Sequence, residues 1–370
     1  MRVRTSLHLL LLPAALLTAG CEDDQSPFEP PAAEEPALPA EPVSGPLEDL
    51  AYWADGYILL GDKTAASTTA NPTYSFNRSG GAITTTRVAG TTGRYIVTFR
   101  GLSAALGSKS SVHVSPVGAD PSYCKPVGGT LVSDKVEVRC YKVGTGVPIN
   151  SLFTLMVIGK TDARAFAFAN QPTATDYAPA GAGSWNPTGA TRVFREGLGR
   201  YRVVFKGLGA RFPTNGGHVQ VNATGTAKTH CKAVEWATRP DFQVLVWCFT
   251  PAGAAADAKF TVLVTPPAAH LAYALANVPT AASYTPDPTY SWNPVGGAVS
   301  VTRSGVGAYF IKWTGIEAEI RDGGSVQVTA YDPLDAQCIV QAWQEYGASI
   351  KCLGPNGLRV DAQYSVMIHS

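Results

Sequence analysis

The chain repeats one pattern three times with a period near 107 residues, and this repeat limits its fold more than any other feature. Self-similarity at a fixed period indicates copies of one structural unit, and a unit of this length is the size of a small domain. The copies share an aromatic motif and a cysteine: Tyr74-Ser75-Phe76-Asn77, Gly183-Ser184-Trp185-Asn186 and Tyr290-Ser291-Trp292-Asn293, with Cys124, Cys231 and Cys338. Any fold for this chain must therefore contain one module three times.

Within each copy, apolar residues alternate with polar ones, which is the pattern of a β-strand with one buried and one solvated face. One strand places His113 between Val112 and Val114, and Gln220 and Gln327 take the place of His113 in the other copies. We expect the side of the strand that carries these three polar residues to contact water.

The third copy contains about seven such runs: 273–277, 298–303, 309–314, 325–331, 338–343, 348–352 and 364–369. Short strands at roughly 8–12-residue spacing indicate a β-sandwich, and the many turns suit a chain with 37 Gly and 27 Pro. We predict an all-β protein with three tandem immunoglobulin-like, Greek-key β-sandwich modules after a disordered tether. The predicted modules are module 1 (residues 51–160), module 2 (residues 161–267) and module 3 (residues 268–370).

Seven cysteines divide into one near the N-terminus and two in each module. Six cysteines allow 15 pairings, and the repeat selects the pairing within each module. The predicted disulfides are Cys124–Cys140, Cys231–Cys248 and Cys338–Cys352. The second cysteine of each pair ends an alternating strand, so we expect its sulfur on the core side. Metal ligation and redox chemistry are disfavoured, because there is no CxxC motif and no histidine at a shared spacing.

The N-terminus has the features of a secretory signal peptide, with Arg2 and Arg4 before an apolar stretch at 7–17. The run Leu17-Thr18-Ala19-Gly20-Cys21 resembles the lipobox of bacterial lipoproteins, although Thr18 stands where that family usually has Leu. The resemblance implies that residues 1–20 are removed and that Cys21 carries the lipid, which would be the membrane attachment. The alternative is an ordinary secretory signal followed by a chance cysteine.

Residues 21–50 form the predicted lipidated tether, with seven Pro and nine acidic residues but no Lys or Arg. Such a segment cannot bury enough apolar surface to fold, and a proline-rich, self-repelling chain is extended. We therefore predict an extracytoplasmic protein, lipid-anchored in the bacterial cell envelope, with the outer membrane favoured where the cell has one. Modules 1 and 2 carry an excess of Lys and Arg that would suit an anionic surface, although scattered solubilising charge is the simpler interpretation.

No catalytic motif is present: the six histidines share no position across the modules, and there is no GxSxG or HExxH sequence. Asp332 and Asp335 could hold Ca²⁺, but their spacing matches no calcium loop, and a solvated turn is the preferred interpretation. Trp236 and Trp343 each lie five residues after a cysteine, where module 1 has Gly129, and are candidates for stacking on sugar rings. The sequence predicts no catalytic residue, cofactor or metal.

The module also resembles a β-repeat of uncharacterised secreted bacterial proteins over residues 57–370, through Pro279-Thr280-Ala281-Ala282-Ser283-Tyr284 and Ser291-Trp292-Asn293. The resemblance implies no activity or ligand. We predict a non-enzymatic cell-envelope lipoprotein whose modules bind or adhere to something outside the membrane, or act as a spacer. The candidate partners are an envelope polysaccharide or a surface protein, and not nucleic acid. The alternative is a secreted hydrolase with a site on the sandwich loops.

Overall fold

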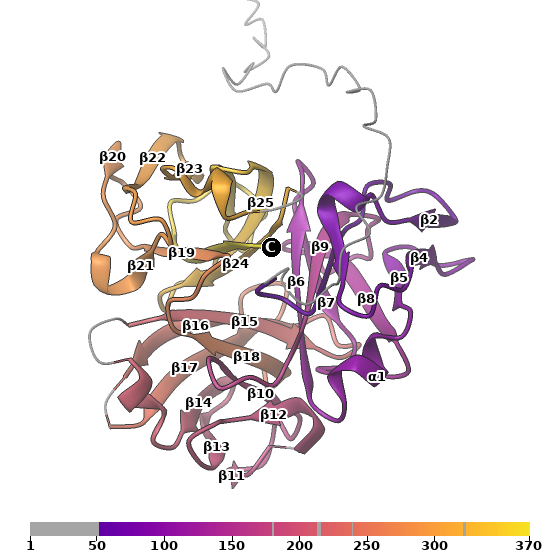
Figure 1. Cartoon of the computed structure of the whole chain (residues 1–370), viewed down its shortest axis with the longest axis horizontal. Helices are drawn as coiled ribbons and strands as arrows, with labels where there is room; N and C mark the ends of the chain where they lie inside the picture. Colours follow the sequence, from indigo (N-terminus) through magenta and orange to yellow (C-terminus); the bar gives the residue numbers. More distant parts are fainter. Residues whose placement is uncertain (1–51, 180, 213–215, 239, 321–322) are drawn as a thin grey trace, which may run out of the picture. The chain divides into compact units, whose positions relative to one another are not determined.

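The computed structural model describes residues 52–370, except 180, 213–215, 239 and 321–322, and these residues belong to one compact unit. The described part is built almost entirely of β-strands, with one short helix, α1 (Leu102–Leu106). Single-turn 3-10 helices lie at Pro72–Tyr74, Gly181–Gly183, Leu208–Arg211, Pro288–Tyr290 and Ile316–Ala318. In Figure 1 module 1 runs from indigo to magenta, module 2 is rose, and module 3 runs from orange to yellow.

Module 1 contains nine strands in two layers. The strands are β1 (Gly56–Leu59), β2 (Ser67–Thr69), β3 (Ser75–Asn77), β4 (Ile83–Arg87), β5 (Arg94–Phe99), β6 (Ser110–Val117), β7 (Ser122–Pro126), β8 (Lys135–Lys142) and β9 (Leu152–Gly159). One layer has the order β3-β1-β9-β6 and the other has the order β2-β4-β5-β8-β7, with antiparallel pairs throughout.

Module 2 repeats the same order in its own two sheets. Its strands are β10 (Ala165–Ala169), β11 (Asp176–Tyr177), β12 (Ser184–Trp185), β13 (Thr191–Gly197), β14 (Arg200–Phe205), β15 (His218–Thr224), β16 (His230–Ala237), β17 (Phe242–Phe249) and β18 (Lys259–Thr265). The two sheets have the orders β12-β10-β18-β15 and β11-β13-β14-β17-β16. The repeat in the sequence is therefore a repeat in topology.

Module 3 has the same topology. Its strands are β19 (Leu271–Ala276), β20 (Ser283–Tyr284), β21 (Ser291–Trp292), β22 (Val299–Gly305), β23 (Ala308–Trp313), β24 (Ser325–Tyr331), β25 (Gln337–Gln344), β26 (Gly347–Leu353) and β27 (Gln363–His369). The sheet orders are β21-β19-β27-β24 and β20-β22-β23-β26-β25. A single parallel bridge between Val340 and Val117 joins a sheet of module 3 to a sheet of module 1.

The prediction of an all-β, sandwich-type chain is confirmed, and each of the seven runs predicted in module 3 overlaps a strand. The prediction missed β20 and β21, because two-residue strands are too short to show alternation. The immunoglobulin-like relation stays a prediction. In immunoglobulin domains the disulfide joins the two sheets, whereas here Cys231 and Cys248 are register partners on neighbouring strands of one sheet.

The recurring Gly-x-Tyr motif is explained by the turn that opens β5, β14 and β23. Gly93, Gly199 and Gly307 have φ between 59° and 65°, a left-handed conformation that glycine adopts without strain. A Cβ at any of the three would approach a cysteine carbonyl oxygen of the adjacent strand to 2.5–2.6 Å. Glycine is thus required twice at this position, by conformation and by space.

The expectation of a solvated side on β6, β15 and β24 is wrong. His113, Gln220 and Gln327 are all fully buried, because these three strands pack against one another where the modules meet (Figure 1). An apolar part of the junction lies beside these polar residues. A cluster there draws on all three modules: Trp53, Ala54, Tyr57, Met156, Ile158, Phe166, Leu263, Leu271, Tyr273 and Met367.

Candidate functional site

The centre of the module junction is a layer of buried polar side chains that bond across module boundaries. His113 contacts the amide oxygen of Asn222 through Nδ1 at 3.1 Å, and Ser115 donates to Gln327 at 2.9 Å. His218 contacts the hydroxyl of Ser365 at 2.8 Å. Burial lowers the pKa of both histidines to about 3, and in His218 the nearby His113 adds to the effect. The layer is therefore built for neutral histidines.

The two tryptophans singled out as sugar-stacking candidates lie at module boundaries. Trp236 is only 6% exposed and packs edge-on against Tyr290 of module 3. Trp343 is half-buried and packs in the same way against Tyr74 of module 1. The indole N–H of each donates at 2.8 Å to a glycine carbonyl of its own module. Both rings pack between modules, and Trp236 is too buried to stack on a ligand. Stacking on the half-buried Trp343 stays a prediction.

The boundary between modules 1 and 2 is built differently at the equivalent positions. Gly129 replaces the tryptophan and Gly183 replaces the tyrosine, and the ring of Phe168 lies against both. Lys109 donates to the carbonyl oxygens of Gly181 and Ser184 at 3.0 and 2.9 Å. This explains why the tryptophan position tolerates glycine in module 1.

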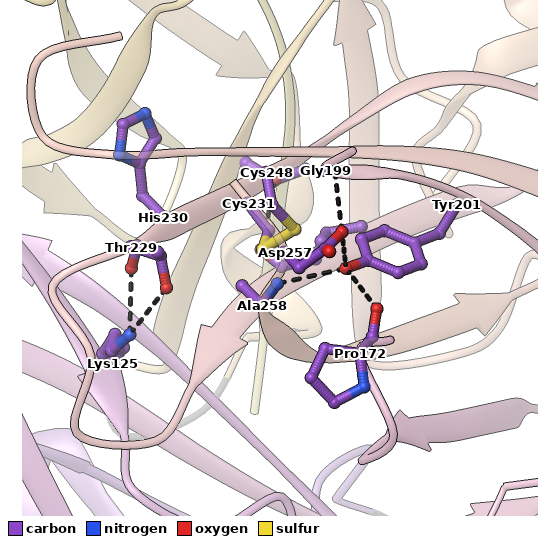
Figure 2. Close-up of a disulfide and its surroundings, with 12 residues drawn as sticks. Lys125, Pro172, Gly199, Tyr201, Thr229, His230, Cys231, Cys248, Asp257 and Ala258 are labelled. Atoms are coloured by element: carbon purple, nitrogen blue, oxygen red, sulfur yellow. Dashed lines mark hydrogen bonds between the residues drawn. A yellow bond between two sulfur atoms is a disulfide. The ribbon is translucent and has the colours of Figure 1, made fainter. Parts of the chain in front are cut away.

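The residue after the first cysteine of a module reaches into the next module. Lys125 donates from Nζ to the carbonyl oxygen of Thr229 at 2.9 Å and contacts its hydroxyl at 3.4 Å (Figure 2). Lys232 donates to Asp332 at 3.1 Å and to the carbonyl oxygen of Leu334. Both lysines are at most 2% exposed. Desolvation, with a smaller contribution from nearby Arg139, lowers the pKa of Lys125 to about 7.

The side chains of Asp332 and Asp335 form neither the calcium site nor the solvated turn that the sequence suggested. Asp332 is buried and pairs with Lys232, and Asp335 accepts from Nε2 of His230 at 2.7 Å. The two carboxylates are thus engaged by Lys232 and His230 of module 2, and on these contacts the turn is not a calcium loop. No group of three or more His, Cys, Asp or Glu that could hold a metal ion occurs within the described ranges.

A cavity lies where the three modules meet, and we name it the junction cavity. Equivalent residues of all three modules line it, among them Val114, Val221 and Val328 and the cysteines 124, 231 and 338. The polar residues of the lining, in contrast, differ between the modules. Lys125, Lys232 and Ile339 follow the three cysteines, whereas Tyr123, His230 and Gln337 precede them. The cavity has about 60 Å³ of space for the centres of water-sized molecules.

A larger hollow, which we name the basic groove, lies between modules 1 and 2. It measures about 560 Å³ and is lined by residues 91–94, 139–141 and 147–148 of module 1 and by Thr226 and Lys228 of module 2. Arg94 and Arg139 lie 37% and 29% exposed, and both pair with Glu137 at 2.9 Å. Lys228 is exposed. Three cations thus stand against one carboxylate.

The structure contains the disulfides Cys124–Cys140, Cys231–Cys248 and Cys338–Cys352. The second sulfur of each pair belongs to a fully buried residue, as expected. Buried disulfides in every module indicate an oxidising, extracytoplasmic compartment. Cys21, with the signal peptide and tether, lies outside the described residues. No described helix has the length and apolar character needed to cross a membrane.

A polar cluster that sequence reasoning missed lies beside the disulfide of module 2. Asp257 accepts from the hydroxyl of Tyr201 at 3.0 Å and from the backbone N–H of Gly199 at 2.9 Å (Figure 2). It also accepts from Arg195 at 2.8 Å. Module 3 repeats it with Asp361, Tyr309, Gly307 and Arg303. In module 1 the amide oxygen of Asn150 takes the place of the carboxylate at Gly93. Because the contact recurs in all three modules, we assign it a structural role: it anchors the last loop of each module.

No family model, curated protein or solved structure matches the chain. The residues that sequence reasoning missed, Lys125, Lys232 and Gln337, flank the first cysteine of each module. The sequence could have indicated these positions. Each lies next to a cysteine that all three modules share, yet its own charge or polarity changes from module to module.

Proposed function

We propose that this protein is a non-catalytic lipoprotein of the cell envelope, whose three modules form one head that binds an acidic polysaccharide in the basic groove. The observation that carries the proposal is the groove itself, with Arg94, Arg139 and Lys228 against the single carboxylate of Glu137. Its volume of about 560 Å³ lies within the usual range of ligand sites.

The chemistry of the groove favours carboxylate or sulfate groups on a polymer. Guanidinium groups bind such anions through paired N–H donors, and Arg94 and Arg139 each keep part of their surface free while they contact Glu137. Lys228 adds a cation from the facing module. A long chain suits the groove better than a small ion, because the cations lie in an open hollow where isolated charges are screened by salt.

Attachment through Cys21 is part of the same proposal. It is supported by the lipobox-like sequence Leu17-Thr18-Ala19-Gly20-Cys21 and by disulfides that fit an extracytoplasmic location. Replacing Cys21 with Ser in the full chain should release the protein from membranes and prevent labelling by radioactive palmitate. Continued labelling of the C21S chain would contradict lipidation at this residue.

Polymer binding is tested with the full chain carrying Cys21→Ser, titrated with polygalacturonate and with neutral dextran over a salt series. We expect binding to polygalacturonate only. The double variant Arg94→Gln/Lys228→Gln should weaken it at least 10-fold and reduce its dependence on salt, because fewer cations are neutralised on binding.

The matched control is Arg192→Gln/Lys206→Gln, which removes two cations of module 2, one in β13 and one directly after β14. Both control residues lie outside the groove and pair with local carboxylates, Asp176 and Asp241. Equal losses in the two double variants would show that only net charge matters, and would refute the groove as the site.

A further inference from the structure

The residue before the first cysteine of a module bonds across to the next module in two of the three copies. The hydroxyl of Tyr123 donates to the carbonyl oxygen of Lys228 at 2.5 Å, and His230 bonds to Asp335 at 2.7 Å. Gln337 holds the equivalent position in module 3 and is 8% exposed, yet neither its amide nitrogen nor its amide oxygen has a hydrogen-bond partner among the described residues. A buried amide without partners is destabilising, so a ligand that bonds to it would be favoured.

The residues after the cysteines add an uncompensated charge to the same place. Lys232 has a carboxylate partner in Asp332, whereas Lys125 contacts only the two neutral oxygens of Thr229. Arg139 lies near enough to Lys125 to disfavour its charged form. A buried ammonium is normally paired with an anion, and none of the described residues supplies one to Lys125.

The junction cavity brings Lys125 and Gln337 together, since both belong to its lining. Its space of about 60 Å³ is several times the ~10–15 Å³ that one water requires. A small molecule of a few heavy atoms therefore fits, whereas a sugar ring or a polymer does not.

We propose that the junction cavity binds a small oxyanion, with the ammonium of Lys125 as its charge partner and the amide of Gln337 as a hydrogen-bond donor. The anion provides what both side chains lack. It also bridges modules 1 and 3, so its binding stabilises the packed arrangement of the head. The site lies apart from the basic groove, because neither Gln337 nor Lys125 lines the groove.

The departures from the repeat support an evolved site over a packing defect. Equivalent valines and cysteines of the three modules form the apolar part of the lining. The polar side chains are the part that differs between copies. Equivalent apolar residues of the three modules thus surround polar residues that occur only once each. Such a lining suits one small ligand bound where the three modules meet.

The test uses the full chain purified from membranes in detergent. Its thermal midpoint is followed as chloride is replaced by inorganic phosphate or by acetate at constant ionic strength. We expect a saturable rise of several degrees with at least one of the two anions. A rise with acetate alone would identify a carboxylate ligand, and a rise with phosphate alone a tetrahedral oxyanion.

Two variants and a control connect the response to the cavity. Lys125→Met removes the charge partner, and Gln337→Glu places a carboxylate of the chain inside the cavity; each should abolish the response or weaken the apparent affinity at least 10-fold. Lys206→Met, in the turn after β14, should leave it unchanged. The absence of a saturable response to either anion in the native chain would overturn the proposal. So would a response that survives in Gln337→Glu, which keeps the size of the side chain.

Discussion

The boundary between modules 2 and 3 and the boundary between modules 1 and 2 join equivalent surfaces with different side chains. At the first, Trp236 packs edge-on against Tyr290 with ring centres 5.7 Å apart. At the second, Gly129 and Gly183 hold the equivalent positions, and Phe168 lies against both of them. The ring of Phe168, in β10 of module 2, thus fills the space that a tryptophan and a tyrosine fill at the other boundary.

The difference shows that the modules are matched in pairs and are not interchangeable. The same space is occupied at every boundary, by a Trp–Tyr pair at two of them and by Phe168 beside two glycines at the other. The third boundary, between modules 3 and 1, follows the first, with Trp343 against Tyr74. A chain of independent, freely swinging modules would need no such matching, so the pairing favours one closed head.

Loss of the Trp–Tyr contact should give the largest effect. Trp236→Ala removes a side chain that is 94% buried and leaves a cavity, which costs about 3–5 kcal/mol of unfolding free energy. Trp343→Ala should cost less, because that side chain is only half-buried. Urea unfolding of both full-length variants measures the difference. Equal losses of unfolding free energy in the two variants would contradict the dependence on burial of the side chain.

Refilling the glycine boundary should give an intermediate effect. Gly129→Trp imitates the other two boundaries, but its Cβ alone would overlap the ring of Phe168. Overpacking of this kind costs about 1–3 kcal/mol. Adding Phe168→Ala should restore part of the loss, since it clears the space that the new ring enters. If the double variant is no more stable than the sum of the two single changes predicts, the two positions do not share this space.

The strands and the disulfide pairing could be predicted from the sequence because both are local or repeated. Alternation reports which residues of a strand share a side, and the 107-residue period pairs the cysteines. The burial of His113, Gln220 and Gln327 could not be read in this way. A polar residue that alternates with valines looks the same whether its side meets water or another module.

The candidate sites were harder to predict for the same reason. Lys125 and Gln337 acquire their neighbours across module boundaries only when the modules pack together, and no spacing within one module encodes that contact. Asp332 illustrates the error that results. An acidic residue in a turn predicts exposure, but here its partner Lys232 lies in another module and buries the pair.

A further effect, about 1.4 kcal/mol per pH unit for each histidine, concerns acid, and it again separates the boundaries. His113 bonds across the boundary of modules 1 and 2, and His218 across that of modules 2 and 3. Burial lowers both pKa values from 6.5 to about 3. Between these values the unfolded chain binds a proton that the folded chain does not. Stability therefore falls as pH drops below about 6.5, by roughly 1.4 kcal/mol per pH unit for each histidine.

His113→Gln places at the boundary of modules 1 and 2 the residue that modules 2 and 3 already have at this position. The variant should stay folded at pH 7, and its unfolding free energy should fall less steeply between pH 6 and pH 4, by about 1.4 kcal/mol per unit. Urea midpoints measured at three pH values in this window give the two slopes. Parallel slopes would mean that His113 is not held neutral by the junction, and that acid acts on the head elsewhere. A shallower slope would assign part of the acid sensitivity to the boundary between modules 1 and 2, which lacks the Trp–Tyr pair.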